Sequence, residues 1–276
     1  MLYRILFSFL FLTSSLYADY RLYALNTEMC GHTTAVFGAM EDGTEIYKND
    51  SYETTINAGA LVTLNFTPGD VFSSNHPISA TTVSSSHYIH FTPEATKGTL
   101  FSIANDRRRY MNVGMYCVSS QDCNVQIDHP DGASYDDTIV IPSESYYAYE
   151  SPQDVNGQTL VVSSDNPIVV KAGYDACNTD NNIVVPDNTE WFGIGSGQLT
   201  LGHSLGTNVT VDAYKVDDNS DPYTTLTIDA DGHKHMGSFG SQHPRNMAMK
   251  LVSDDLFNAY AWRDGDGAVS RGVLMR

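Results

Sequence analysis

Short apolar runs on either side of a polar turn recur along this chain. The stretch TLVVSSDNPIVVKAG (159–173) has two such runs around a Ser/Asp/Asn turn. Similar stretches are EMCGHTTAVFG (28–38), DVFSSNHPISA (70–80), MYCVSSQDCNVQI (115–127), LTLGHSLGTNVTVDA (199–213) and AMKLVSDDLFNAYAW (248–262). Short β-rich runs that flank turn-forming residues are typical of strand, tight turn and strand. The pattern therefore predicts six such units, spaced by roughly 40–50 residues.

A second phrase alternates with the first. Its copies are YETTINAG (52–59), HYIHFTPE (87–94), DDTIVIPS (136–143), NNIVVPDN (181–188) and YTTLTIDA (223–230), with a poorer copy at 269–276. They read as alternating strands that mostly end in Pro, Gly or Asp. The first phrase lacks its partner at the N-terminus, and the last lacks its partner at the C-terminus. Joining the two ends makes the sixth unit whole.

This phase favours a ring that is closed by pairing the two ends of the chain. Repeats of roughly 40–45 residues with four strands each are typical of a β-propeller, in which radial repetition protects the sheet edges. We therefore predict an all-β fold, a six-bladed β-propeller of four-stranded repeats of about 43 residues, over the single domain 19–276. The alternative is three tandem immunoglobulin-like β-sandwiches of about 86 residues each, since alternate copies resemble each other more than neighbours do.

The N-terminus carries an export pattern. Arg4 precedes an apolar run at 5–12, and Leu16, Tyr17 and Ala18 form a small-residue cleavage site. This is typical of a signal peptide over 1–18 and predicts a secreted protein, extracellular or at the cell surface. The apolar run is too short to span a bilayer, so no membrane insertion is expected.

The charge is strongly acidic, with 33 Asp and Glu against 15 Lys and Arg and a formal net charge of −18. This argues against nucleic acid as a partner and favours cations or basic surfaces. Oxygen ligands on flexible loops are what Ca²⁺ prefers. The candidate ligands are Asp217, Asp218, Asp221, Asp264 and Asp266. The alternative is that Asp fills these loops because it suits turns.

Two further clusters could bind ions. Arg107, Arg108 and Arg109 form the basic cluster of NDRRRY (105–110) and could bind a sulfate, a uronate or an acidic loop of a neighbouring molecule. His233 and His235 of HKH would lie on one face of a strand, as a metal pair does. The alternatives are a solvated loop charge and an exposed strand end.

Cysteines and sequons fit an exported chain. Four cysteines, an even number, favour disulfides. A local bridge between Cys117 and Cys123 is the easiest pairing and would leave Cys30 with Cys177, although three connectivities stay open. Asn49, Asn65 and Asn208 each begin an N-x-[ST] sequon, consistent with a glycoprotein.

The cadence of TIVIPSES followed by LVVSSDNPIVVKAG resembles the repeats in the N-terminal region of IgGFc-binding-type proteins. That family recurs in mucus-associated and microbial surface proteins. The resemblance extends over most of the mature chain as a rhythm. It implies an extracellular binding or structural role, and no site residue is carried over from it.

Two standard catalytic motifs are missing from the sequence, H-E-x-x-H and a phosphate loop of the standard spacing. We therefore predict a non-catalytic structural or adhesion protein, which could assemble as a homo-oligomer or a filament. One alternative is a glycan-binding lectin, with Tyr135, Tyr146, Tyr147 and Tyr149 as the densest aromatic group. The other is a propeller hydrolase or lyase with an acidic site at the channel mouth.

Overall fold

The computed structural model describes residues 20–25, 33–83, 88–105, 111–130, 132, 134–152, 157–174, 182–195, 198–204, 206–215, 220–236, 247–263 and 270–273. Over these ranges the chain consists of antiparallel strands with one short 3₁₀ turn, Glu94–Thr96. None of the segments described is a helix long and apolar enough to cross a membrane. The predicted all-β fold is confirmed.

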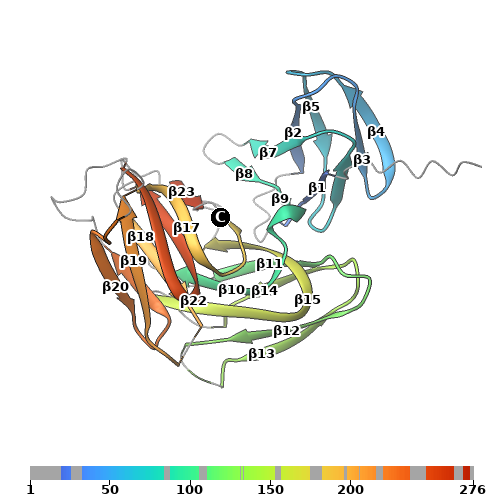
Figure 1. Ribbon diagram of the computed structural model, residues 1–276. Coiled ribbons are helices and arrows are strands. Elements are labelled where there is room, and N and C mark those ends of the chain that lie inside the picture. Colours follow the sequence, from blue (N-terminus) through green and yellow to red (C-terminus); the bar gives the residue numbers. More distant parts are fainter. Residues whose placement is uncertain are drawn as a thin grey trace, which may run out of the picture.

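The strands form three consecutive sets, which we call the first, second and third repeats (Figure 1). The first contains β1 (Tyr20–Tyr23), β2 (Thr34–Ala39), β3 (Thr44–Lys48), β4 (Ser51–Ile56), β5 (Leu61–Asn65), β6 (Val71–Ser74), β7 (Ile78–Val83), β8 (Tyr88–His90) and β9 (Thr92–Pro93). The second contains β10 (Gly98–Asn105), β11 (Met111–Cys117), β12 (Cys123–Asp128), β13 (Asp137–Ile141), β14 (Tyr146–Glu150), β15 (Gln158–Tyr174) and β16 (Asn182–Val184). The third contains β17 (Asn188–Gly195), β18 (Gln198–His203), β19 (Val209–Lys215), β20 (Thr224–Ile228), β21 (His233–Met236), β22 (Met247–Arg263) and β23 (Ser270–Val273).

Strand pairing follows one order in all three repeats. The first has the ladders β4-β3-β6-β1 and β5-β2-β7-β8. The second has β13-β12-β15-β10 and β14-β11-β15-β16, and the third has β20-β19-β22-β17 and β21-β18-β22-β23. In the later repeats one strand of 17 residues, β15 or β22, replaces β6 and β7 and crosses from one ladder to the other. Each repeat is therefore a nearly closed, barrel-like pair of ladders.

Each repeat encloses its own apolar core. Burial alternates along the strands, as in β12, where every second side chain is buried. In the first repeat Phe37 and Phe72, from the two ladders, lie with ring centroids 4.6 Å apart, and both side chains are fully buried. In the third repeat Trp191 packs near Phe257, and its indole N–H donates to the Phe257 carbonyl at 2.9 Å. Burying one such ring stabilises the fold by roughly 1.5–3 kcal/mol.

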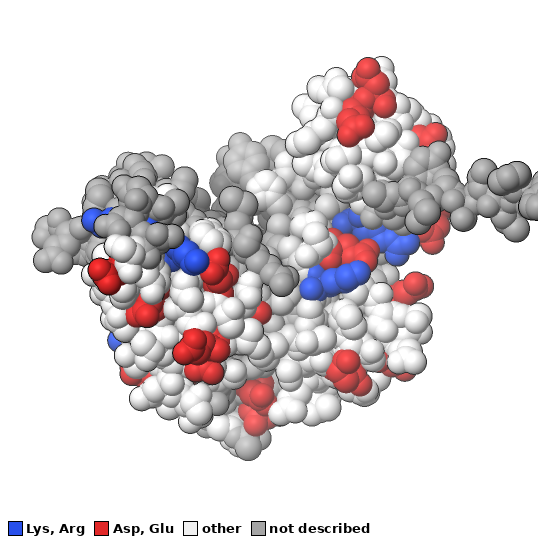
Figure 2. All heavy atoms as spheres, viewed as in Figure 1, with Lys and Arg blue, Asp and Glu red and all other residues white. Residues whose placement is uncertain are grey.

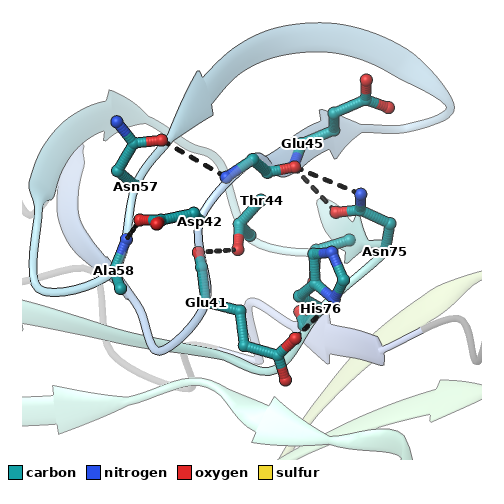
Figure 3. A network of polar contacts seen from close by, with 10 residues as sticks. Glu41, Asp42, Thr44, Glu45, Asn57, Ala58, Asn75 and His76 are labelled. Atoms are coloured by element: carbon teal, nitrogen blue, oxygen red, sulfur yellow. Dashed lines mark hydrogen bonds and ion pairs between the residues drawn. The ribbon is translucent and has the colours of Figure 1, made fainter.

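The recurrent Ser-Asp or Ser-Asn pair lies at a corner of the repeat, where the chain crosses from one ladder to the other, and side-chain hydrogen bonds close this corner. Asn75 follows β6 and accepts a hydrogen bond from the Glu45 backbone N–H at 2.8 Å (Figure 3). In the second repeat Asp165 takes the same place and accepts from the Asn124 backbone N–H at 2.8 Å. In these two copies of the phrase the polar residue thus satisfies a backbone donor near the start of the third strand of the repeat.

An aspartate also ties the same corner to the next turn. Asp42 accepts from the Ala58 backbone N–H at 3.0 Å (Figure 3). Asp122 accepts from the Ser143 backbone N–H at 2.9 Å in the second repeat. In the corner of the first repeat, His76 Nδ1 also lies 3.1 Å from the Glu41 carboxylate, which is an ion-pair contact when the imidazole is protonated. The Asp and Asn side chains of this corner are therefore structural.

Six four-stranded blades closed by the two chain ends are not confirmed. In the described ladders β1 pairs with β6 and β9, and β23 pairs with β22, so the first and last strands do not pair with each other. The phrase copies at 70–80, 159–173 and 248–262 correspond to β6–β7, β15 and β22. These strands hold the same place in the pairing order of the three repeats. The copies at 115–127 and 199–213 are a different corner of the same repeats. Two successive copies therefore belong to one repeat.

Candidate functional site at the junctions between repeats

The first junction joins the first and second repeats through an apolar contact. Tyr23, at the end of β1, and Leu25 just beyond it pack against Tyr116 of β11 and Val169 of β15. The Tyr23 and Tyr116 rings lie with centroids 4.7 Å apart. Tyr23 is only 2% exposed and Val169 is fully buried, although both point away from the core of their own repeat. The junction is therefore a packed, water-excluding contact.

Lys171 lies two residues beyond Val169 on the same face of β15. Its side chain is fully buried, and its Nζ donates to the His90 carbonyl of the first repeat at 2.6 Å. Burial lowers the pKa of this amine to about 7. The pKa of the His90 imidazole is also lowered, by burial and then by the nearby Lys171 charge. A titratable amine thus bridges the two repeats.

Charged side chains border this junction. The Tyr23 hydroxyl donates to Glu94 Oε2 at 3.1 Å, and Glu94 also lies 3.9 Å from Arg21 Nε and 2.8 Å from Lys97 Nζ. Burial, followed by the Glu94 charge, raises the pKa of Tyr23, so its phenol stays protonated and donates. Figure 2 shows basic and acidic side chains gathered where the first repeat meets the second.

A cavity of about 400 Å³ opens beside these residues. It is lined by Arg21, Tyr23, Asn49, Asp50, Gly69, Val71, Tyr116, Val118 and Glu144. One guanidinium, two carboxylates and two phenol rings suit the binding of a small hydroxyl-rich ligand.

The second junction joins the second and third repeats through hydrogen bonds. Asp187, in the connection between them, accepts from the Ser102 backbone N–H at 2.7 Å and from the Ser102 Oγ at 2.6 Å. Asn258 of β22 donates to the Val185 carbonyl at 2.7 Å and to Asp187 at 3.2 Å. The Tyr260 hydroxyl donates to the Ser102 carbonyl at 3.1 Å. The Asp187 carboxylate and the Tyr260 hydroxyl thus meet at Ser102 of β10.

β18 approaches β10 closely because Gly202 has no side chain. A Cβ on Gly202 would lie 2.9 Å from the Ser102 carbonyl oxygen and 3.3 Å from Ala104 Cβ. Beside this contact Thr159 Oγ1 donates to the Gly232 carbonyl at 2.7 Å, again from the second repeat to the third. The absence of a side chain at Gly202 thus allows direct contact between strands of two repeats.

Asp187 carries the perturbed carboxylate of this junction. Burial raises its pKa to about 6, although the hydrogen bonds from Ser102 and Asn258 and the proximity of His203 act in the opposite direction. Burial thus drives a Lys at the first junction, Lys171, and an Asp at the second, Asp187, toward the neutral form.

Both junctions use the same positions of the repeat. Tyr116 pairs with Val169 in the second repeat, and Gly202 pairs with Asn258 in the third. Each pair is one residue along its strands from a buried pair. The buried pair is Cys117 with Ile168 in the second repeat and His203 with Phe257 in the third. We call these outward positions the docking face; in the first repeat they are Gly38 and Ser79, one step from the pair Ala39 and Ile78.

On the opposite side of each junction, the contacting residue also holds an equivalent place in its repeat. Tyr23 follows the core residue Leu22, and Ser102 follows the core residue Phe101. We call this outward residue of the first strand the receiving position. In the third repeat it is Phe192, which follows the core residue Trp191.

The predicted disulfide between Cys117 and Cys123 is present, with 5.8 Å between the Cα atoms, and it joins the end of β11 to the start of β12. Cys30 and Cys177 lie outside the described residues. So do Asp217, Asp218, Asp264 and Asp266 of the predicted Ca²⁺ site, whereas Asp221 is exposed. Over the described ranges no three His, Cys, Asp or Glu residues gather to hold a metal.

Arg107, Arg108 and Arg109 also lie outside the described residues, as does the side chain of His235. His233 lies at the second junction, with its Nδ1 3.5 Å from Thr159 Oγ1.

Among the sequons, Asn65 and Asn208 are exposed. Asn49 donates to Asp70 at 2.7 Å and accepts from the Val71 backbone N–H at 2.9 Å. Its side-chain amide thus joins the turn after β3 to the start of β6.

The dense tyrosine group does not form one platform. Tyr149 is buried in the core of the second repeat, and Tyr146 packs at the first junction. Tyr147 is 38% exposed, and Tyr135 lies beside His129 with ring centroids 5.7 Å apart. Their rings thus lie in different parts of the repeat.

Sequence reasoning named Tyr146 and His233 but missed the other junction residues. A signal for them was present in the second phrase, where Pro93-Glu94 and Pro186-Asp187 follow an apolar strand. In the structure both acidic residues accept a hydrogen bond from the receiving position of the preceding repeat. A Pro-acid pair after a strand thus marks each junction.

Comparisons with known proteins add no relative. The chain matches no protein-family model, and searches of curated proteins and of solved structures find no significant match. The geometry of the junctions is therefore the observation on which a function rests.

Proposed function

We propose that this chain is an exported, non-catalytic structural protein of a cell surface or extracellular matrix, in which three immunoglobulin-like β-sandwiches are stacked into one stiff unit. The observation that carries the proposal is the equivalence of the two junctions. The docking face of one repeat covers the receiving position of the repeat before it, once with Tyr116 on Tyr23 and once with Gly202 on Ser102. A chain that repeats one mode of stacking suits a scaffold.

The sandwich architecture is supported by the pairing order. Each repeat has two antiparallel ladders that share one apolar core. Core positions recur at a spacing close to the roughly 100 residues typical of immunoglobulin-like domains. Phe72, Val162 and Leu251 hold the same place in the three cores.

Stiffness is supported by the burial of polar groups at the junctions. Neighbouring domains move relative to each other unless their interface is large and well packed. Here Lys171 and Tyr260, both almost completely buried, each hydrogen-bond to a backbone carbonyl of the preceding repeat. Opening either junction would leave these groups to find new partners, which holds the repeats in one arrangement.

Export is supported by the N-terminal pattern and the disulfide. Residues 1–18 have the order of a charged start, an apolar run and a small-residue site. The bond between Cys117 and Cys123 persists in an oxidising compartment and is rare in the cytosol.

The test is to localise the protein in its source cells. Immunogold labelling of intact cells and of the washed extracellular material should label the surface or the matrix. Thiol trapping without prior reduction should show Cys117 and Cys123 protected. A cytosolic protein with both thiols free would overturn the proposal.

A second candidate function is glycan binding at the first junction, favoured by the cavity beside Tyr23 and Tyr116. Its lining by Arg21, Asp50 and Glu144 offers donors and acceptors for sugar hydroxyls. A glycan array should then give hits that weaken at least tenfold in Arg21→Ala and remain in Lys215→Ala, which changes an exposed residue of the third repeat. An array with no hits for the folded wild type rejects this candidate.

A further inference from the structure

The two surfaces that join the repeats are each left uncovered at one end of the described unit. At the docking face, Val169 and Lys171 of the second repeat are fully buried, as is Asn258 of the third. The equivalent Ser79 of the first repeat is exposed. At the receiving position, Tyr23 is 2% exposed and Ser102 is 0% exposed, whereas Phe192 of the third repeat is 37% exposed.

The uncovered docking face of the first repeat is apolar at its centre. Gly38 pairs with Leu61 on one side and with Ser79 on the other. Leu61 is 73% exposed, among the most exposed large apolar side chains described. Its Cδ2 lies 3.2 Å from the place of a Cβ on Gly38, so its methyl groups lie beside the bare backbone of Gly38. This gives a shallow apolar surface next to an exposed leucine.

The uncovered receiving position presents an aromatic ring with a polar border. Lys250 Nζ lies 5.5 Å from the centroid of the Phe192 ring and 2.9 Å from Glu190. An apolar centre with a charged rim is the usual composition of a protein–protein contact. A ring at this position meets a ring at the first junction, where Tyr23 packs on Tyr116. The Phe192 ring of the third repeat would likewise fit the space beside Gly38 on an uncovered docking face.

We propose that a second copy of this chain docks head to tail, with Phe192 of one copy packed against Gly38 and Leu61 of the next. The proposal rests on the structural role argued above and names its partner. The occupant is a second copy because the two uncovered surfaces hold the same positions that contact each other at the two junctions within the chain. A contact between two different surfaces does not close on itself unless the rotation forms a ring, so it generates chains of molecules.

The experiment is sedimentation velocity of the purified chain without residues 1–18, from about 1 to 200 µM, together with negative-stain electron microscopy. The wild type should form oligomers whose length increases with concentration. Leu61→Glu and Phe192→Glu should each be monomeric, with the dissociation constant raised at least tenfold, because each buries an unpaired charge. Val140→Glu is the matched control, since Val140 is a 56% exposed apolar residue of β13 at neither end. It should assemble like the wild type.

Mixing the two variants makes the test specific for direction. Leu61→Glu retains an intact Phe192, and Phe192→Glu retains an intact docking face. An equimolar mixture should therefore give dimers and no longer species, whereas a symmetric contact through Leu61 would give dimers of Phe192→Glu on its own. Circular dichroism melting curves like that of the wild type show that each variant is folded.

Three outcomes would overturn the inference: a wild type that stays monomeric at 200 µM, variants that assemble like the wild type, or a mixture that forms no dimers. A monomeric wild type that still labels the cell surface rejects head-to-tail assembly alone. A cytosolic protein rejects the structural role on which the assembly rests. The two failures are thus distinguishable.

Discussion

Lys171 of the second repeat donates a hydrogen bond across the first junction to the carbonyl of His90 in the first repeat. The amine is fully buried, and its lowered pKa results from that burial. A buried ammonium with a carbonyl as its acceptor is costly, whereas a neutral amine at the same place is tolerated. The junction therefore couples the packing of two repeats to the protonation of one side chain.

We predict that Lys171→Met removes a pH dependence of stability. The pKa of Lys171 is about 7 when folded, against an ordinary value of 10.5, so between these pH values the unfolded chain binds the extra proton. Stability from this group is present above pH 10.5 and is lost as pH falls toward 7, by on the order of 1 kcal/mol per pH unit. Urea unfolding from pH 7 to 10 should show this slope in the wild type and a flatter one in the variant.

The matched control for Lys171→Met is Lys215→Met, which changes an exposed lysine of β19. It should keep the slope of the wild type. Equal slopes in all three proteins would show that Lys171 is solvated and would contradict the buried contact with His90.

Asp187 should give a pH dependence of the opposite sign. Burial raises the pKa of its carboxyl to about 6 from an ordinary value of 3.8, so between these pH values the folded chain binds the extra proton. Its contribution is fully present below pH 3.8 and is lost as pH rises through 6. Asp187→Asn should flatten the fall in stability between pH 4 and 6, measured by urea unfolding at half-unit steps.

The control for Asp187→Asn is Asp221→Asn, an exposed carboxylate of the third repeat. It should retain the fall in stability between pH 4 and 6. If Asp187→Asn behaves like Asp221→Asn, then the carboxylate at the second junction is not buried as described.

A methyl group on Gly202 should separate the second and third repeats. Its Cβ would lie 2.9 Å from the Ser102 carbonyl, and a backbone oxygen in a packed junction cannot move aside easily. We expect Gly202→Ala to destabilise the fold by about 1–3 kcal/mol. Small-angle X-ray scattering should also show a larger radius of gyration.

Gly38→Ala is the matched control because Gly38 holds the equivalent place in the first repeat. Its Cβ would meet the tip of the exposed Leu61 side chain, which can rotate away. The change should cost less than about 0.5 kcal/mol. Similar losses in both variants would mean that the cost reflects glycine in a strand and not the junction.

The strands and the local disulfide were predictable because their signals are local. Alternation along β12 places Val125 and Ile127 in the core, and the short spacing of Cys117 and Cys123 favours a bridge across one corner. The Ser-Asp pair in 159–173 is a local signal too, and it predicts the end of one strand and the start of another. In the structure β15 continues through it, because pairing with β12 and then with β11 overrides the turn preference of Asp165.

The junctions were beyond prediction from the sequence because they depend on which outward face the neighbouring repeat covers. Val169 and Ser79 hold the same place in their repeats, yet the first is buried and the second is exposed. Periodicity separates the two faces of a strand but does not show what lies against the outer one. Lys171 in a strand likewise reads as a surface residue until the first repeat covers it.

The Cys117–Cys123 disulfide should stabilise the second repeat modestly. It closes a loop between residues six apart in sequence, for which chain entropy gives about 2 kcal/mol. In the first repeat Ala39 and Thr44 hold these two places, and the corner is closed by Asp42 and Asn75. The second repeat retains the same hydrogen bonds through Asp122 and Asp165.

Cys117→Ser/Cys123→Ser should therefore lower the free energy of unfolding by about 2 kcal/mol while the repeat still folds. Urea unfolding of the variant and the wild type, each with and without reductant, measures the difference. Reductant should lower the stability of the wild type to near that of the variant and leave the variant unchanged. A variant that no longer folds would show that the hydrogen-bonded corner cannot form without the bridge, unlike its counterpart in the first repeat.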